Sequence, residues 1–394
     1  MINVSNVTSY YKWLFVGLFV VYVPSILPFI PYTIAGLNMT GWSWTVLLLV
    51  SIYYWIKNPV NKFPVYYWIP WVLYLAVWLF FDMSYLGIQL TLQYLLPLVV
   101  GVVASGFVYN KRIFNLIFKY LLILTAAISF LFVSEFLSLG LRQPHWAATV
   151  IFLTVPASLV LGVFYLSKDF KYLILFFAMM LMPVWAMTRM AVVVFLVILV
   201  MHFANTKVVM KAVVMVMALF VGLLVVNSAA FQEKTFYKGS GDVSQLTLNY
   251  YEDNSQFNTS GRSNFYQYFE KGLRESPILG NGPRSDYAVL ESSTGFKEVH
   301  NDYLSIIYNY GYFGLAMLMI GLVLTFFSVF RRMSYLRAIN DGYGYLVASS
   351  VLVLFLGLLM FMYTDNIIKY NIFFMNFFFA MIGIVFAEKS YNEE

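Results

Sequence analysis

The chain has 394 residues, of which 61% are hydrophobic and only 11% are charged. A soluble protein of this size keeps a polar exterior, so this composition excludes a soluble globular domain and predicts a chain embedded in lipid. There is no cysteine, which excludes disulfides and thiolate metal sites. The net charge of +6 would suit nucleic acid, but in a membrane protein it first reports basic cytoplasmic loops, and we expect no nucleic-acid partner.

Apolar runs long enough to cross a bilayer, about 20 residues each, recur along the sequence. They lie near 12–31, 41–57, 64–81, 85–108, 113–138, 146–167, 171–187, 190–206, 210–229, 303–329, 343–363 and 367–387. The pair at 171–206 also fits one broken unit. No small-residue cleavage site follows the first run, so we interpret it as a retained helix. The sequence predicts an all-α polytopic membrane protein with about twelve transmembrane helices.

The placement of lysine and arginine predicts the orientation. With a cytoplasmic N-terminus, the inner side carries 14 of the 24 basic residues: Lys12, Lys57, Lys62, Lys111, Arg112, Lys119, Lys168, Lys171, Lys207, Lys211, Arg331, Arg332, Arg337 and Lys389. The short outer loops hold only Arg142, Arg189 and Lys369. Both termini are therefore expected in the cytoplasm. Helices 1–9 occupy residues 1–229, an extracytoplasmic loop with short amphipathic helices spans 230–301, and helices 10–12 with the C-terminus occupy 302–394.

Arg142 and Arg189 lie at the outer membrane face, where the charge distribution disfavours them. An arginine near the hydrocarbon costs up to about 3 kcal/mol unless it is paired or hydrated. Arg189 either snorkels to cap the last carbonyls of the seventh span or binds an anion in a cavity open to the outer face. Glu135, near the outer end of the fifth span, is expected to be a structural partner for such an arginine.

The long loop changes character along its length. Residues 239–261 are rich in Gly, Ser, Asn and Asp, which is typical of a loop or mobile lid. Phe265, Phe269 and Leu273 then recur at helical spacing and predict a short amphipathic helix on the membrane surface. The following "PILGNGP" predicts a tight turn. It is not a nucleotide fingerprint, because no strand precedes it.

The loop ends in His300, Asn301 and Asp302, at the mouth of the tenth span. Asn301 or Asp302 suits the N-cap of that helix, and a helix N-terminus suits phosphate. His300 is either an ordinary interfacial histidine or a base, whereas His202 is expected to be a plain interfacial residue. No group of histidines and carboxylates has metal-ligand spacing, and no nucleophile motif such as GxSxG occurs.

Together, "TRMAVVVF", "PILGNGP" in a long loop and "HNDYLSIIYNYGYFG" opening the next span resemble the O-antigen ligase and polymerase superfamily, over about 184–316. The signature HN-x-YL-x6-G-x2-G comprises His300, Asn301, Tyr303, Leu304, Gly311 and Gly314. The resemblance implies a GT-C-type glycosyltransferase of the bacterial inner membrane, with a periplasmic active site and with neither metal nor cofactor. Its donor is a glycan on undecaprenyl pyrophosphate.

In that family two arginines and one histidine matter for activity, and by motif they map onto Arg189, Arg262 and His300. Transfer from a pyrophosphate needs charge neutralised on the leaving group, and guanidinium groups hold phosphate oxygens bidentately. We therefore expect Arg189 and Arg262 to bind the pyrophosphate, with Arg142 and Arg274 as outer helpers.

Histidine has a suitable pKa to take the acceptor proton. We expect Asn301 or Asp302 to orient His300, and Tyr303 to complete the substrate-binding residues.

The sequence leaves three functions open. A polymerase passes the glycan to a lipid-linked repeat unit, whereas a ligase passes it to the lipid A core. The 38 Phe and 31 Tyr residues suggest an AT-rich gene such as those of O-antigen clusters, which favours the polymerase, and a chain-length-regulating membrane protein is then a candidate partner. A flippase for lipid-linked glycans has about twelve helices too, but it has no use for the long outer loop.

Overall fold

The computed structural model describes residues 4–27, 29–136, 146–186, 188–202, 229–236 and 265–390, with residues 212, 216, 220, 223 and 227 between them. The helices of these ranges are α1 (Val4–Val20), α2 (Val23–Ile26), α3 (Met39–Lys57), the 3-10 helix η1 (Val65–Tyr67), α4 (Ile69–Phe81), α5 (Tyr85–Ser105), α6 (Lys111–Phe136), α7 (Trp146–Phe152), α8 (Thr154–Ser167), α9 (Phe170–Trp185), α10 (Arg189–Met201), α12 (Ala229–Thr235), α13 (Phe265–Glu275), α14 (Ser285–Thr294), α15 (Asp302–Ala338), α16 (Gly342–Thr364) and α17 (Met375–Phe386). Strands β1 (Thr33–Ile34) and β2 (Leu37–Asn38) pair antiparallel, and β3 (Val108–Tyr109) pairs in parallel with β4 (Glu388–Lys389).

Within the described ranges, 6 helical segments are long and apolar enough to cross a membrane: Met39–Lys57, Tyr85–Ser105, Lys111–Ser134, Ala147–Ser167, Asp302–Ala338 and Gly342–Thr364. Helices α4, α9, α10 and α17 are shorter apolar helices. A helical chain with several candidate membrane spans is thus confirmed, and the count of about twelve stays a prediction. The expected ninth span, 210–229, lies largely outside the described residues.

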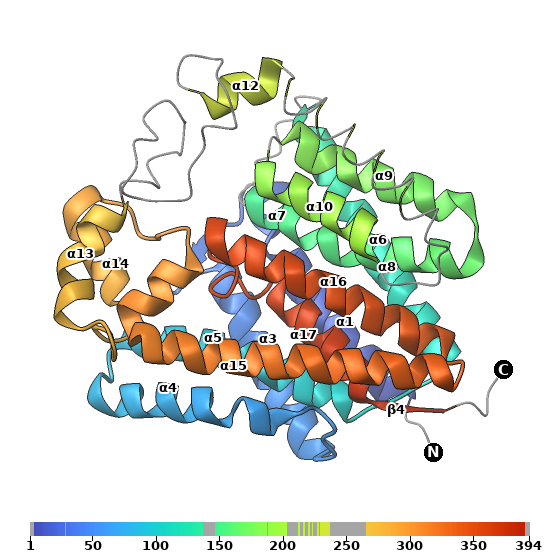
Figure 1. The fold of residues 1–394 in the computed structure, drawn as a ribbon, viewed down its shortest axis with the longest axis horizontal. Helices are drawn as coiled ribbons and strands as arrows, with labels where there is room; N and C mark the ends of the chain where they lie inside the picture. Colours follow the sequence, from blue (N-terminus) through green and yellow to red (C-terminus); the bar gives the residue numbers. More distant parts are fainter. Residues whose placement is uncertain are drawn as a thin grey trace.

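Helices α16 and α17 form the centre of the bundle (Figure 1). Helix α17 packs against α5, and α16 packs against α8, α10 and α15. Large apolar side chains are exposed on the outer helices, among them Ile56, Leu73, Phe80, Ile174, Leu181 and Phe327. An apolar exterior around an apolar core is the arrangement that lipid tails solvate.

Two helices have other bounds than the apolar runs of the sequence. Helix α1 begins at Val4 rather than near residue 12. In the expected span at 367–387, only α17 is helical, while residues 367–374 form turns. Lys369 and Asn371 are buried in this break and have partners there. Lys369 lies 2.8 Å from Asp286, and the Asn371 side chain donates to the Gln93 carbonyl at 2.9 Å.

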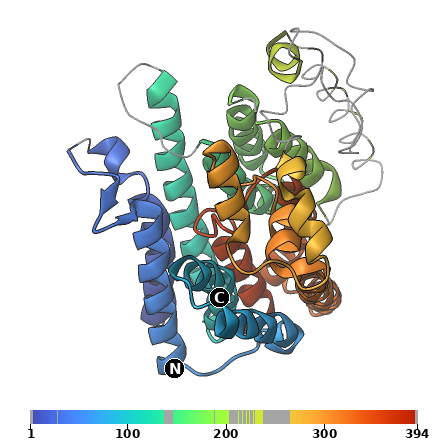
Figure 2. The ribbon, with the colours of Figure 1, turned by 90° about the vertical axis from the view of Figure 1, so that its left-hand side faces the viewer.

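The helical bundle has two ends, which we call the loop end and the termini end (Figures 1 and 2). The loop end is formed by α13, α14, the starts of α5 and α15, and residues 365–374. The termini end is formed by the ends of α3, α5 and α15, the start of α16, and the β3–β4 pair. In Figure 1 the loop end lies on the left, and both chain termini lie on the right beside β4.

Helix α13 forms where the sequence predicts it, but it does not expose its apolar face to lipid. Phe269 is fully buried, and its ring centroid lies 4.7 Å from that of Tyr308. Leu273 packs into the same small core, with Leu290 of α14 and Val299. The expectation of a helix lying on the membrane surface is therefore wrong, because the protein itself covers that face.

Candidate functional site

Helix α15 is interrupted at Gly311, where φ is 69° and ψ is 179°. The kink leaves backbone groups without partners inside the helix, and the turn after α13 supplies them. Carbonyls at 308–309 accept hydrogen bonds from amides at 281–282, and amides at 312–313 donate to carbonyls at 277–278, all at 2.9–3.1 Å. The turn is thereby fixed against the membrane helix by backbone contacts.

Only glycine fits at the two closest points of this contact. A Cβ on Gly311 would lie 2.0 Å from the Ile278 carbonyl oxygen, and one on Gly280 would lie 2.5 Å from the Asn309 carbonyl oxygen. Both residues also have positive φ, which disfavours side chains. The P-x-x-G-x-G turn and the glycine of the HN signature are therefore the two sides of one interface.

His300 lies directly before α15, at the loop end. Its φ is 52°, in the left-handed region that few residues other than glycine adopt. Its side chain is 38% exposed, and Nδ1 lies 3.3 Å from Oδ1 of Asp365, which is 13% exposed. Asp365 follows α16 and also accepts from the amide of Asn366 at 2.8 Å. A carboxylate at Nδ1 favours the tautomer that leaves Nε2 as the acceptor.

The side chains of Asn301 and Asp302, which follow His300, accept hydrogen bonds from backbone amides. The Asn301 side chain caps α15 by accepting from the amide of Leu304 at 3.0 Å, which confirms it as the cap. The buried carboxylate of Asp302 accepts from the amide of Ile368 at 3.0 Å. The sequence assigned the orientation of His300 to one of these two residues, whereas the structure gives His300 a carboxylate partner in Asp365.

Tyr303 joins α15 to α16. It is half-buried, and its hydroxyl donates to the Leu359 carbonyl at 3.0 Å. That contact holds the two helices together one to two turns before Asp365.

Four charged groups form a buried chain beside His300. Arg284 Nη1 lies 2.9 Å from Glu298 Oε1, Lys369 Nζ lies 2.9 Å from Glu298 Oε2, and Lys369 Nζ lies 2.8 Å from Asp286 Oδ2. The Ser305 hydroxyl also donates to Asp286. We call Arg284, Glu298, Lys369 and Asp286 the ion chain. It connects α14, the segment before His300 and the segment after Asp365.

The ion chain keeps its charges despite burial. Burial alone raises the pKa of Asp286, but the Lys369 ammonium and the Arg284 guanidinium outweigh it and hold that pKa below its usual value. Burial lowers the pKa of Lys369, but the carboxylates of Asp286 and Glu298 outweigh it and raise that pKa. Two cations face two anions, so the chain is neutral as a whole. Because its charges neutralise one another, it is suited to position His300 and Asp365 rather than to hold a phosphate.

Arg189 is the first residue of α10 and is half-buried. Helix α10 runs antiparallel to α16, because Val194 Cγ1 lies 2.9 Å from the Cβ position of Gly357 while His202 Nε2 lies 3.3 Å from Ser350 Oγ. Arg189 therefore lies level with the last turns of α16, at the loop end. Helices α9 and α10 are separate helices, and α10 begins at this arginine.

The other predicted residues are less informative. Arg274 is 78% exposed and pairs with Glu270 at 2.6 Å. Arg142, Arg262 and the side chain of Glu135 lie outside the described residues, as do residues 239–261. His202 is buried against the Ser158 carbonyl rather than interfacial. Among the described residues no group of three or more His, Asp or Glu residues is arranged to hold a metal ion.

Sequence reasoning missed Asp365 and the ion chain. Lys369 carried a signal, since it is one of the few basic residues in a short outer loop. Asp286 and Glu298 carried none, because a long loop contains many carboxylates and their pairing is decided by the fold.

Residues 174–319 match a protein family described as O-antigen ligase. The matched segment contains Arg189, His300 and both glycines of the interface at Gly280 and Gly311. It ends before Asp365 and Lys369. No curated protein matches the chain.

Proposed function

We propose, from the match of residues 174–319 to the O-antigen ligase family, that this chain is a membrane glycosyltransferase of the O-antigen ligase and polymerase superfamily. The observation that carries the proposal is His300, half-exposed at the loop end beside the Asp365 carboxylate. The family match indicates an activity of the ligase or polymerase type. The finer statements below are ours.

The donor in this proposal is a glycan on undecaprenyl pyrophosphate. An acceptor hydroxyl oxygen attacks the anomeric carbon, the bond from that carbon to the pyrophosphate oxygen breaks, and the lipid pyrophosphate leaves. His300 takes the proton of the acceptor hydroxyl through Nε2 and later releases it to water. Asp365 holds the imidazole ring in place and stabilises the imidazolium that forms.

Guanidinium groups stabilise the leaving pyrophosphate in this scheme. Arg189 lies at the loop end, level with the last turns of α16, and suits this role. Arg262, with Arg142 and Arg274 as outer helpers, completes the proposed set. The ion chain takes no part in the chemistry and keeps His300 close to Asp365.

We propose a lipid-linked repeat unit as the acceptor, which makes the protein a polymerase acting at the periplasmic face of the inner membrane. A chain-length-regulating membrane protein is a candidate partner. The test is reconstitution in liposomes with undecaprenyl-pyrophosphate-linked repeat units as the sole substrate, followed by separation of products by length. A ladder supports the polymerase. Products that form only after lipid A core is added identify a ligase, and translocation without a covalent product identifies a flippase and refutes the transferase.

A further inference from the structure

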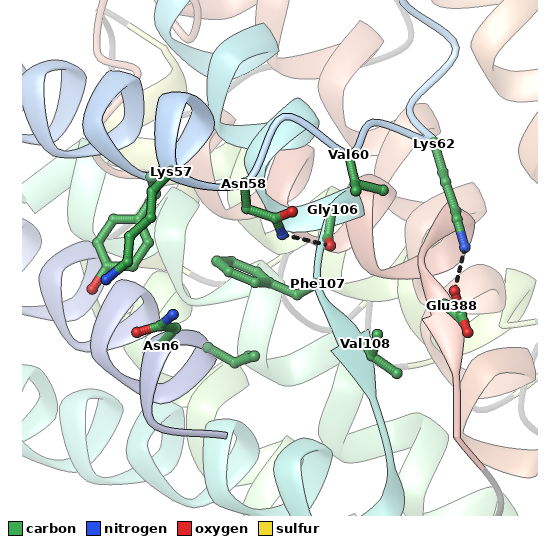
Figure 3. A pocket seen from close by; sticks show the side chains of 11 residues that line it. Asn6, Lys57, Asn58, Val60, Lys62, Gly106, Phe107, Val108 and Glu388 are labelled. Carbon is green, nitrogen blue, oxygen red and sulfur yellow. Dashed lines mark hydrogen bonds and ion pairs between the residues drawn. The ribbon is translucent and has the colours of Figure 1, made fainter. Parts of the chain in front are cut away.

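The termini end, opposite the loop end that holds His300, contains an open cavity of about 360 Å³. Figure 3 shows the side chains that line it. It is lined by the first turn of α1, the end of α3, the loop that follows α3, the end of α5 and the start of β4. Its polar side chains are Asn6, Lys57, Asn58, Lys62 and Glu388. The proposed transfer reaction gives none of these residues a role.

Two lysines face one carboxylate in this cavity. Lys62 Nζ lies 2.7 Å from Glu388 Oε2 and is neutralised by it. Lys57, on the opposite side of the cavity in Figure 3, has no carboxylate within ion-pair distance in the described part of the chain. Its ammonium lies 5.7 Å from the Tyr53 ring centroid. Among the described residues that line it, the cavity therefore has one positive charge in excess.

The neighbouring backbone adds to this preference for an anion. The first turn of α1 lines the cavity, and the positive end of a helix dipole lies at its N-terminus. The carbonyl of Gly106, at the end of α5, would repel an anion, but the Asn58 side chain donates to it at 2.9 Å. That hydrogen bond reduces the negative potential that the end of α5 would otherwise present.

Exposed apolar side chains lie on α3, the helix whose end forms part of the cavity wall. Leu49, Ile52 and Ile56 follow one another at helical spacing along α3 and are 63%, 37% and 77% exposed. Val60, which is 50% exposed, lies in the cavity wall itself. A ligand with a charged head and an apolar tail matches both surfaces, whereas a small soluble anion uses only the head.

The geometry points to a binding site for the phosphate-bearing headgroup of an anionic phospholipid in this cavity, with an acyl chain along α3. Basic pockets between helices at the cytoplasmic side of a membrane bind such headgroups. Lys57 supplies the free charge, and Asn6 and Asn58 supply amide groups. The site is independent of the proposed transferase activity and would persist if that activity proved different.

The test uses the purified full-length protein in detergent with phosphatidylglycerol, phosphatidylcholine or inorganic phosphate as probes. We expect phosphatidylglycerol to raise the thermal unfolding midpoint and to bind more tightly than phosphatidylcholine. Lys57→Gln should weaken its binding about fivefold, which corresponds to one surface charge. Lys119→Gln is the matched control, because Lys119 is an exposed lysine of α6 outside the cavity, and it should bind as wild type does.

Glu388→Gln gives a test of opposite sign. It removes the carboxylate that neutralises Lys62, so binding of phosphatidylglycerol should become tighter. Damage to the fold would weaken binding instead, so the direction of the change distinguishes the electrostatic effect from misfolding. Equal effects of inorganic phosphate and phosphatidylglycerol would overturn the lipid assignment in favour of a soluble phosphate. Unchanged binding in Lys57→Gln, or weaker binding in Glu388→Gln, would overturn the site.

Discussion

At the loop end, Arg284, Asp286 and Lys369 are each at least nine-tenths buried and paired. At the termini end, Lys62 and Glu388 form an ion pair whose side chains are 40% and 61% exposed, and Lys57 is exposed beside the cavity. Buried charges are held in one arrangement because separating them in a low dielectric is costly. Exposed charges are screened and remain available. The charges at the loop end are thus suited to positioning side chains, and those at the termini end are suited to attracting an anion.

The largest expected effect separates two histidines, His300 at the loop end and His202 away from it. His300→Ala should lower the transfer rate about 10²–10⁴-fold, because a general base of this kind contributes that much. His202→Asn should keep transfer close to wild type, since His202 is buried against the Ser158 carbonyl, away from the loop end. Single-turnover transfer in liposomes checks both variants. Full activity in a folded His300→Ala protein would remove His300 from the mechanism.

The second prediction concerns the ion chain. Asp286→Asn leaves Lys369 with one carboxylate instead of two and should lower the free energy of unfolding by about 3 kcal/mol. Glu388→Gln breaks the exposed pair with Lys62 and should change the free energy of unfolding little. Denaturant titration in detergent gives both values. Equal effects at the two ends would show that burial does not distinguish these pairs.

The buried pair of Asp286 and Lys369 predicts that stability depends on pH. The pKa of Asp286 is lowered in the folded state. Its contribution to stability is therefore fully present above the pKa of an unfolded aspartate, about 3.9, and is lost as the pH falls below it. The pKa of Lys369 is raised, so its contribution is present below about 10.4 and is lost as the pH rises through the folded value. The stability difference between wild type and Asp286→Asn should therefore be constant near neutrality and shrink below about pH 4.

The third prediction compares two glycines. Gly311→Ala places a Cβ 2.0 Å from the Ile278 carbonyl oxygen at positive φ, and it should destabilise the protein by about 3 kcal/mol. Gly342→Ala, at the start of α16, meets nothing within 4 Å, so it should be neutral or stabilising by up to about 1 kcal/mol. Thermal unfolding midpoints of the two variants check this. A Gly311→Ala protein as stable as Gly342→Ala would mean that the turn is not held against α15.

These cases also show which features of the fold could be predicted from the sequence and which could not. Hydropathy predicted most helices, the HN signature predicted where α15 begins, and "PILGNGP" predicted the tight turn before it. The pairing of Lys369 with Asp286 joins residues 83 positions apart, and nothing local to either residue indicates it. For α13, periodicity predicted an apolar face but not its cover, which is Tyr308 and its neighbours rather than lipid.

The fourth prediction concerns Asp365 as a positioning residue. Asp365→Asn should lower the maximal transfer rate about 10- to 100-fold with little change in KM, as loss of a supporting carboxylate does elsewhere. Asp365→Glu should recover part of the activity, because it keeps the carboxylate. A purely structural role would instead lower stability without changing the rate of the folded protein. A kcat of Asp365→Asn close to that of wild type would contradict the positioning role.

The smallest effect belongs to Arg274, whose side chain is 78% exposed and paired with Glu270 one turn away on α13. Arg274→Gln should change the free energy of unfolding by about 0.5 kcal/mol or less, because exposed ion pairs contribute little. If Arg274 assists in holding the donor, its loss raises KM a few-fold and leaves kcat unchanged. Lys271→Gln is the matched control, since Lys271 is 86% exposed on the same helix. A rise in KM with both variants would indicate general attraction of the anionic donor to α13, whereas a rise with Arg274→Gln alone would place Arg274 at the donor.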